Sequence, residues 1–154
     1  MNERLDLDQL RSFAKQGGGE KRVQAQHAKG KMTARERLEL LLDPETFVET
    51  DMFVTPRHGS VKVNGSAPEN YTDGVITGWG KIDDRLVYVY AQDFTILGGS
   101  LGESHGLKIA RLIEQVPNLV FLPLISELYP ARRPPWRSIL HGYLNSRSLE
   151  KNTP

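Results

Sequence analysis

The sequence contains no cysteine and no long hydrophobic run. Without cysteine the chain cannot form disulfides, use a thiolate as a nucleophile, or bind zinc or an iron–sulfur cluster through sulfur. No apolar run approaches the roughly 20 residues that a membrane-spanning helix needs. The charged N-terminal segment also lacks the apolar stretch that is typical of a secretory signal. We therefore expect a cytoplasmic protein without a membrane span.

The chain also has no large excess of positive or negative charge. The 20 lysines and arginines nearly balance the 19 aspartates and glutamates, so the formal net charge is +1. This balance argues against nucleic acid or an anionic membrane as a partner. The four histidines are scattered along the chain, with no two at a spacing typical of metal ligands: His27, His58, His105 and His141. We therefore predict no metal site.

Residues 1–31 predict a basic helical arm. Leu10 and Phe13 share one face at helical spacing, and the run Gly17–Gly19 ends this first element. Residues 20–31 are basic and polar, and they predict an exposed helix or arm with few apolar anchors. Such an arm needs another surface to pack against if it is to be ordered.

Residues 32–115 predict an α/β domain that begins with a capped helix. Thr33 and Glu36 have the spacing of a capping box, in which each side chain bonds the backbone N–H of the other residue. The following apolar stripe consists of Leu38, Leu41 and Leu42. Asp43-Pro44 ends the helix, because proline disfavours the α conformation in the residue before it.

Three β-rich segments follow this helix, at Phe47–Val54, Val75–Ile82 and Arg85–Gln92. The second and third segments are separated only by Asp83-Asp84, which predicts a hairpin. The third is nearly continuously apolar, so we expect it to be central and covered on both faces. Residues 55–74 are rich in glycine and proline and predict a long loop.

A glycine-rich turn, Gly98-Gly99-Ser100, then leads into a helix that we expect to end near Gln115. Ser100 and Glu103 have the spacing of a second capping box. The apolar positions of this helix are Leu107, Ala110, Leu112 and Ile113. Residues 75–115 therefore predict the order strand, strand, turn, helix.

Two long motifs, KGKMTARERLELLLD (29–43) and QDFTILGGSLGESH (92–105), carry a family resemblance. The stretch from about residue 17 to residue 115 resembles the N-terminal region of the biotin-dependent acyl-CoA carboxyltransferases, with a looser patch at 55–72. The most similar members are the propionyl-CoA carboxylase β subunit and the methylmalonyl-CoA decarboxylase carboxyltransferase. The resemblance implies a partial crotonase-like (ClpP/crotonase) α/β fold, namely an N-terminal carboxyltransferase domain at 32–115 preceded by the helical arm.

The same resemblance implies a reaction. These enzymes move a carboxyl group from carboxybiotin to the α-carbon of an acyl-CoA, here a propionyl-CoA-like one, and backbone N–H groups stabilise the enolate. The N-terminal domain holds the acyl-CoA, and the C-terminal domain of a neighbouring subunit holds carboxybiotin. The expected partners are therefore acyl-CoA, biotin carboxylase and biotin carboxyl carrier subunits, with homo-oligomers in the full-length form.

A basic cluster at the start of the capped helix is a candidate CoA-binding rim, because CoA carries a 3′-phosphate and a diphosphate. Its members are Lys29, Lys31, Arg35 and Arg37. The alternative, which we favour, is a solvated face or a set of subunit contacts. Neither interpretation assigns a catalytic residue.

The Gly98-Gly99-Ser100 turn is the second candidate CoA contact, because N–H groups and the helix dipole at a helix N-terminus favour anions. The favoured alternative is a tight turn with close packing of helix against strand, since this short motif is weak. Asp93, directly after the buried strand, is either a general base or an acceptor of backbone N–H bonds in the following turn. We favour the acceptor.

The composition changes at Val116. Residues 116–154 hold six of the nine prolines and no glycine before Gly142, whereas the family has a glycine-rich loop there that supplies oxyanion-hole N–H groups. Without glycine, close approach of the backbone to a thioester is harder. We interpret 116–154 as a divergent Pro/Arg-rich tail, either frameshifted and ended early, which we favour, or a genuine alternative structure.

We therefore expect a truncated carboxyltransferase component that is inactive alone because it lacks the catalytic loops. Two alternatives remain open. The chain is a non-catalytic binding or assembly fragment of a carboxylase complex, or it is the homologue that works in the decarboxylase direction.

Overall fold

The computed structural model describes residues 6–57, 71–115 and 123–124, and the tail predicted at 116–154 therefore lies almost entirely outside the described residues. Three helices precede the sheet: α1 (Leu7–Lys15), α2 (Glu20–Ala28) and α3 (Ala34–Leu41). The strands are β1 (Val48–Thr50), β2 (Val75–Ile82), β3 (Arg85–Gln92) and β4 (Pro123–Leu124). Two short 3-10 turns, η1 (Tyr71–Gly74) and η2 (Leu97–Gly99), and helix α4 (Glu103–Glu114) complete the described chain.

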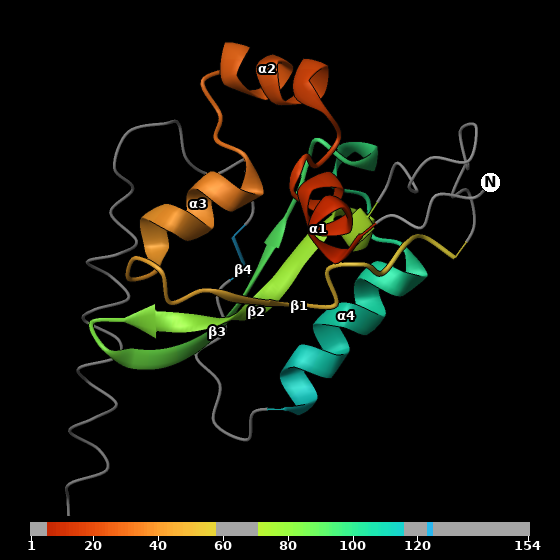
Figure 1. Cartoon of the computed structure of the whole chain (residues 1–154). Helices are drawn as coiled ribbons and strands as arrows, with labels where there is room; N and C mark the ends of the chain where they lie inside the picture. The colour runs from red at the N-terminus through yellow and green to blue at the C-terminus, as the bar shows by residue number, and fades with distance from the viewer. Residues whose placement is uncertain (1–5, 58–70, 116–122, 125–154) are drawn as a thin grey trace, which may run out of the picture.

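The helices of the predicted arm are present, and α2 stands apart from the rest (Figure 1). No residue of α2 is buried, which confirms the exposed helix expected from its composition. The capping box of α3 is also confirmed. The Glu36 N–H donates to Thr33 Oγ1 at 3.3 Å, and the Thr33 N–H donates to Glu36 Oε2 at 2.7 Å.

The sheet has the strand order β1-β2-β3-β4, with two antiparallel pairs followed by a parallel one. The predicted hairpin of β2 and β3 is confirmed with its bounds unchanged. Asp83 and Asp84 both have positive φ, 49° and 62°, as a tight two-residue turn of the I′ type requires. Between β3 and β4 the chain passes through α4, which is the crossover that a parallel pair needs.

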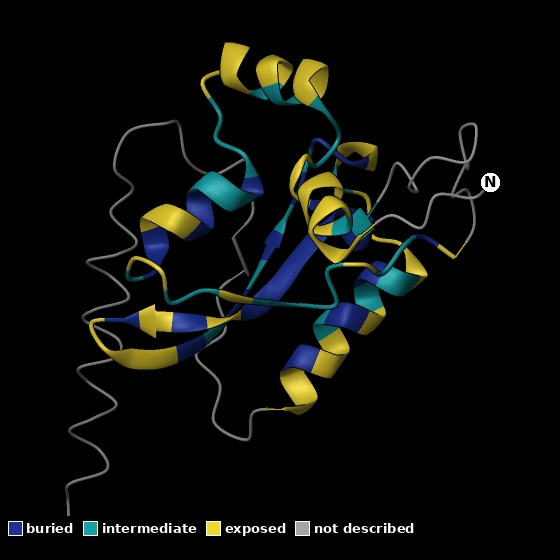
Figure 2. Cartoon of the chain, in the orientation of Figure 1, coloured by how far each residue is buried: buried dark blue, intermediate teal, exposed yellow. Residues whose placement is uncertain are grey.

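The hydrophobic core lies between α3 and one face of the β2–β3 hairpin (Figure 2). Its buried members are Ala34, Leu38, Leu41, Leu42, Ile76, Ile82, Val87, Val89 and Ala91. Helix α4 packs against β2, and in Figure 1 it lies across the strands from α3. The sheet thus sits between two helices, and the loop from β3 to α4 emerges at the end of the strands that carries η1 and η2.

Two strand predictions were wrong. The strand expected at Phe47–Val54 is only β1, because Asp51 adopts a left-handed φ of 53° and the Val54 N–H bonds the Asp51 carbonyl, so the chain turns away from the sheet. Strand β3 is not covered on both faces. Leu86 is 56% exposed and Tyr88 is half-buried, since α4 packs against β2 and η1, with its Lys108 bonded at Val75, the first residue of β2.

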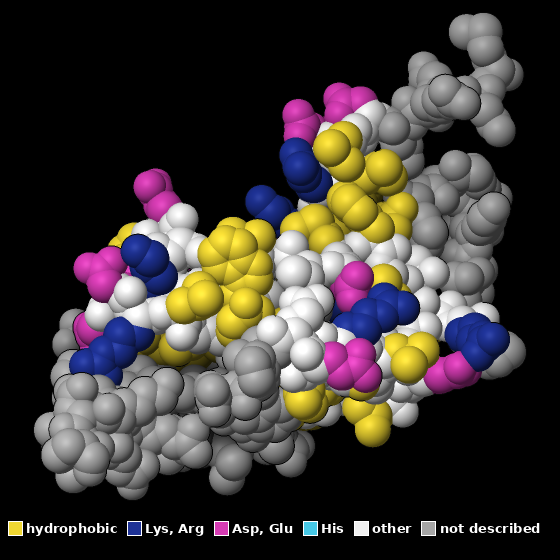
Figure 3. Space-filling model, turned by 90° about the horizontal axis from the view of Figure 1, so that it is seen from below, with side chains coloured by type: hydrophobic (Ala, Val, Ile, Leu, Met, Phe, Trp, Pro, Cys, Tyr) yellow, Lys and Arg dark blue, Asp and Glu magenta, His cyan; other side chains and the backbone are white. Residues whose placement is uncertain are grey.

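Uncovered apolar side chains lie in register across three strands. Val48 pairs with Trp79, which pairs with Tyr88, so the three share one face of the sheet. Val48 and Trp79 are exposed. Figure 3 shows hydrophobic side chains in several clusters between charged ones on the side of the molecule seen from below. In the ranges that the structure describes, no helix is long and apolar enough to cross a bilayer.

Candidate functional site

The turn that follows β3 is organised by Asp93. Its carboxylate oxygen Oδ1 accepts the backbone N–H of Thr95 at 2.9 Å and the Thr95 hydroxyl at 2.6 Å. The Ile96 N–H donates to the Asp93 carbonyl at 3.1 Å. This confirms the prediction that the Asp93 carboxylate accepts backbone N–H bonds in the turn, and it leaves the carboxylate engaged within the fold.

The glycine-rich turn is a tight left-handed one. Leu97, Gly98 and Gly99 all have positive φ, and the N–H groups of Gly99 and Ser100 donate to the carbonyls of Ile96 and Leu97. These two amides are therefore used by the turn itself. Gly98 is exposed, and a Cβ placed on it would meet no atom within 4 Å. The backbone at Gly98 is thus open to close approach by a ligand.

The capping box predicted for Ser100 and Glu103 was wrong. Helix α4 has Gly102 as its N-cap, and this glycine has no side chain that could cap the helix. Instead, the carboxylate oxygen Oδ2 of Asp73, in η1, accepts the His105 backbone N–H at 2.8 Å. A negative charge is favourable at a helix N-terminus, so Asp73 already occupies the place where a bound anion would be stabilised.

A small cavity of about 180 Å³ lies beside this junction. It is lined by Pro56, Arg57, Asp73, Leu97, Ser100, Gly102 and Glu103. Arg57 and Glu103 form an ion pair at its rim. The cavity therefore combines two carboxylates with one arginine, a balance that suits a neutral polar group better than a phosphate.

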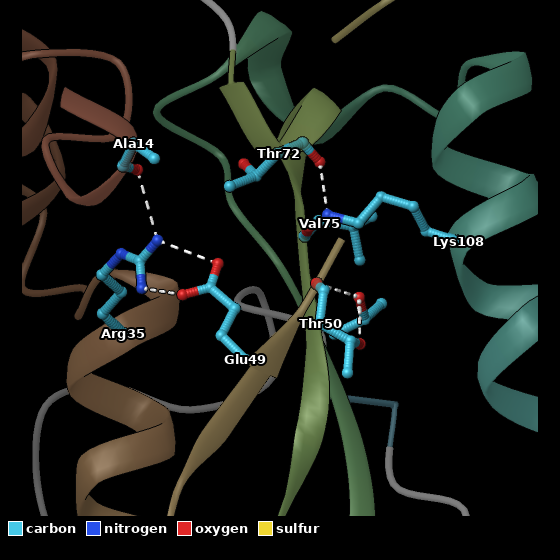
Figure 4. A network of polar contacts seen from close by, with 8 residues as sticks. Ala14, Arg35, Glu49, Thr50, Thr72, Val75 and Lys108 are labelled. Atoms are coloured by element: carbon cyan, nitrogen blue, oxygen red, sulfur yellow. Dashed lines mark hydrogen bonds and ion pairs between the residues drawn. The ribbon is translucent and has the colours of Figure 1, made fainter. Parts of the chain in front are cut away.

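Beneath the junction, α4 carries two buried polar side chains, Lys108 and His105. Lys108 Nζ donates to the carbonyls of Thr72 at 2.9 Å and Val75 at 2.5 Å (Figure 4). Burial lowers the pKa of Lys108 to about 8, while the carboxylates of Glu49, Asp51 and Asp73 oppose the shift.

Burial also lowers the pKa of His105, so the neutral imidazole is the favoured form. His105 Nδ1 lies 3.0 Å from the Asp73 carbonyl oxygen, and since a carbonyl only accepts, Nδ1 carries the proton. Nε2 is then a buried acceptor without a donor among the described residues. Sequence reasoning missed this pair. The available signal was the spacing of His105, Lys108 and Leu112, which puts all three on one helix face.

Two arginines of the predicted basic rim are engaged in the fold. Arg35 forms a two-point ion pair with Glu49, and it also donates to the Ala14 carbonyl at 3.2 Å (Figure 4). Arg37 is buried and donates to the carbonyls of Thr33 at 3.2 Å and Gln92 at 2.5 Å. Burial lowers the pKa of Arg37 to about 10, with the Asp93 charge opposing the shift.

The two lysines of the predicted rim differ from the arginines in their environment. Lys29 is exposed and Lys31 is half-buried, and neither forms an ion pair with another residue of the described ranges. The chain that leads into the Gly98–Ser100 turn contacts the segment just before α2, where the Gly18 N–H donates to Thr95 Oγ1 at 2.9 Å. Lys29 caps the other end of this nine-residue helix, about 13 Å away along its axis. The seven predicted residues therefore form no single cluster.

In the part of the chain that the structure describes, no group of three or more histidines, aspartates or glutamates is placed to hold a metal ion. His27 is instead paired with Glu36 through Nε2 at 2.9 Å. Although burial acts in the opposite direction, the hydrogen bonds from Thr33 and His27 lower the pKa of Glu36, so this carboxylate stays ionised.

The sequence profile described as "Carboxyl transferase domain" matches residues 25–126. This chain belongs to the carboxyl transferase domain family. The match begins within α2 and covers the whole described part of the chain after that helix, including β4. It thus continues past residue 115, and the predicted change of character at 116 stays a prediction, because 116–122 and 125–154 lie outside the described residues.

Three curated relatives of this carboxyl transferase chain illustrate the similarity. It is 51% identical over 108 residues to the propionyl-CoA carboxylase beta chain of Roseobacter denitrificans, covering 70% of the chain and 21% of that protein. It is 48% identical over 115 residues to the human mitochondrial beta chain, covering 75% and 21%. It is 57% identical over 98 residues to methylmalonyl-CoA decarboxylase subunit alpha of Veillonella parvula, covering 64% and 19%. The chain thus spans about a fifth of these relatives.

Solved structures agree on the fold. The transcarboxylase 12S hexamer with bound methylmalonyl-coenzyme A matches with a TM-score of 0.65 and 38% identity, covering 89% of this chain and 26% of that one. A single-chain, multi-domain long-chain acyl-CoA carboxylase matches with a TM-score of 0.63 at 23% identity, covering 84% of this chain and 15% of that one. The predicted partial crotonase-like α/β fold is confirmed.

Proposed function

We propose that this carboxyl transferase chain holds an acyl-CoA of the propionyl-CoA type, whose α-carbon receives a carboxyl group from carboxybiotin. The observation that carries the proposal is the open, left-handed backbone at Gly98, in a turn that joins a central strand to α4. A backbone without a side chain lets a long, thin ligand lie directly against the chain. Membership of the carboxyl transferase family supplies the class of ligand.

The charges divide the CoA molecule between two places. Asp73 already neutralises the N-terminus of α4, so this helix end is a poor site for a diphosphate. We assign the neutral pantetheine arm to the turn at Gly98–Ser100 and the phosphates to Lys29 and Lys31, which have no ion-pair partner within the described ranges. Extended CoA is long enough to contact both ends of α2.

Arg35 and Arg37 enter this proposal in a supporting role. Arg35 ties α3 to β1 and to the end of α1, and Arg37 ties α3 to the end of β3. Both anchor the helix that follows the Lys29–Lys31 loop. The side chains of Arg35 and Arg37 are consequently less available for contact with phosphate than the side chain of an exposed lysine is.

We further propose that the chain does not transfer carboxyl groups alone. An enolate needs N–H donors aimed at the thioester oxygen, and the amides of Gly99 and Ser100 are occupied within their own turn. Such donors and the carboxybiotin pocket would come from other polypeptide, in a homo-oligomer with biotin carboxylase and biotin carboxyl carrier subunits. The cytoplasm is the compartment we propose for this assembly.

Two related functions remain as proposals. A non-catalytic binding or assembly fragment is supported by the apolar row of Val48, Trp79 and Tyr88, of which the first two are exposed and offer a surface to another polypeptide. The decarboxylase direction is supported by the 57% identity to the Veillonella decarboxylase subunit. Neighbouring genes for a biotin carboxylase or for a membrane sodium-pump subunit would separate the two directions.

Calorimetric titration of the 154-residue chain with coenzyme A and with dephospho-coenzyme A tests the assignment of the phosphates. We expect Lys29→Glu/Lys31→Glu to weaken CoA binding at least tenfold, because the rim then repels phosphate. Lys21→Glu is the matched control, since Lys21 is an exposed lysine of α2 outside the proposed rim. Equal loss in both variants would contradict the assignment. The transfer assay adds carboxybiotin and propionyl-CoA, and we expect no methylmalonyl-CoA from the chain alone.

A further inference from the structure

The segment that enters β2 has an unusual backbone. Thr72, Asp73 and Gly74 all have positive φ, 71°, 46° and 70°, so three consecutive residues are left-handed. Only glycine adopts this conformation readily. Aspartate tolerates it better than most residues do, as at Asp83 and Asp84, but the β-branched Thr72 persists there only if the surrounding structure holds it.

Lys108 of α4 provides part of that hold. Its side chain is buried, and its ammonium group donates to the carbonyls of Thr72, the first residue of the left-handed segment, and Val75, the residue that follows the segment (Figure 4). A buried lysine is expensive unless its hydrogen bonds are satisfied. An apolar side chain would have packed α4 on β2 without this cost, so packing alone does not account for a lysine here.

His105, one helical turn earlier, holds the carbonyl in between. Its ring Nδ1 donates to the Asp73 carbonyl, while the Asp73 side chain accepts the His105 backbone N–H. The remaining carbonyl, that of Gly74, accepts the Asp93 N–H at 2.8 Å. Four successive carbonyls are thus satisfied, three of them by α4 side chains. We call His105 and Lys108 together the α4 clasp.

The left-handed segment that the clasp holds lies against the residues on either side of the candidate CoA turn. A Cβ on Gly102, two residues after Ser100, would be 3.3 Å from the Asp73 carboxylate. A Cβ on Gly74 would be 3.3 Å from the Ile96 carbonyl. The left-handed segment therefore touches the chain on both sides of η2, at the residue before it and just beyond it. Any shift of α4 relative to this segment moves the turn.

We infer that His105 and Lys108 are positioning residues, which hold α4 on the left-handed segment and thereby fix the Gly98–Ser100 turn in the geometry that faces ligand. The inference deepens the proposed function and rests on it only for the identity of the ligand. A purely structural role would predict general destabilisation when the clasp is lost. A positioning role predicts that disorder concentrates at the turn.

Amide hydrogen exchange of the full chain, resolved by residue, tests this. Lys108→Met keeps the length of the side chain and removes its donors. Leu112→Ala is the matched control, because Leu112 is buried on the same helix and makes no clasp bond. The two variants are compared under conditions in which their unfolding midpoints are lowered by the same amount. We then expect the amide exchange rate at residues 98–102 to rise at least tenfold in Lys108→Met and to change little in Leu112→Ala. An equal rise in both variants would overturn the inference.

A second pair of variants keeps the inference falsifiable if Lys108→Met does not fold. His105→Asn retains an N–H donor close to the position of Nδ1, whereas His105→Leu removes it. We expect the asparagine variant to keep slow exchange at 98–102 and the leucine variant to lose it. Identical behaviour of the two, or no protection of the turn in the unsubstituted chain, would contradict positioning.

Coenzyme A titrations on the same variants separate this inference from the proposed function. If the unsubstituted chain shows the exchange pattern but binds no coenzyme A, the clasp stands and the proposed function falls. If coenzyme A binds equally well to Lys108→Met and to the unsubstituted chain, the turn does not need the clasp, and the positioning role is wrong.

Discussion

Arg35 and Glu49 form a two-point ion pair that joins α3 to the edge strand β1, with Nη1 to Oε2 at 2.6 Å and Nη2 to Oε1 at 3.1 Å. The side chains are only 20% and 5% exposed. Two parallel bonds in a shielded setting make this contact far more dependent on both partners than a surface ion pair is. It also fixes β1, which has no neighbouring strand on its outer side within the described residues.

Glu49→Gln should therefore lower the free energy of unfolding by about 3 kcal/mol, because it leaves the arginine charge shielded and without its counterion. Urea unfolding measures this. Asp8→Asn is the control, since Asp8 pairs with Arg11 on the surface and its loss should cost less than about 1 kcal/mol. If Glu49→Gln is as mild as Asp8→Asn, the pair does not stabilise the fold. Adding Arg35→Met to Glu49→Gln should recover part of the loss.

Because Lys108 is buried, we expect the free energy of unfolding to increase as the pH rises. Its folded-state pKa of about 8 lies below the 10.5 of an ordinary lysine. Between these values the unfolded chain binds more protons than the folded one, so the free energy of unfolding increases with pH. From pH 7.5 to 9.5 we expect a gain of about 2 kcal/mol. Urea titrations across this range should show the rise in the unsubstituted chain and its absence in Lys108→Met, and a parallel rise in both would contradict the assignment.

The close contact at Gly18 provides a test of how the N-terminal arm packs against the rest of the fold. A Cβ at this position would lie 1.8 Å from the Thr95 carbonyl oxygen, and the Gly18 N–H bonds the Thr95 hydroxyl. Gly18→Ala should destabilise the contact by about 2 kcal/mol and raise amide exchange in α1 and α2. Gly30→Asn is the control, because a Cβ at Gly30 would meet no atom within 4 Å and asparagine tolerates the left-handed backbone of that position. Normal exchange in Gly18→Ala would show that the arm does not rest on this turn.

Features with a local cause were predictable from the sequence. The Thr33–Glu36 capping box, the Asp83-Asp84 hairpin and the Asp93 turn each depend on residues at most three positions apart. Hydrogen-bond chemistry at that spacing is largely independent of the rest of the fold. For the same reason the bounds of β2 and β3, which follow from composition and the turn between them, agree with prediction.

Features with a distant cause were not predictable. Ser100 and Glu103 have the spacing of a capping box, yet Asp73, 32 residues before His105, caps α4 instead. From the sequence alone, a lysine in a helix is expected to be exposed to solvent. The burial of Lys108 is explained only by the carbonyls of η1 and β2 that accept its hydrogen bonds. The basic cluster likewise divides because Glu49 and the Gln92 carbonyl engage Arg35 and Arg37. One chain segment does not encode these partners.

The most direct test of the account is the affinity of the chain for propionyl-CoA with and without a side chain at Gly98. Asparagine tolerates left-handed backbone, so Gly98→Asn fills the open space while leaving the turn intact, and its thermal unfolding midpoint serves as the check. Calorimetric titration should show saturable binding to the unsubstituted chain and at least tenfold weaker binding to Gly98→Asn at an unchanged midpoint. No saturable binding by the unsubstituted chain, or equal affinity of the two, would contradict the account.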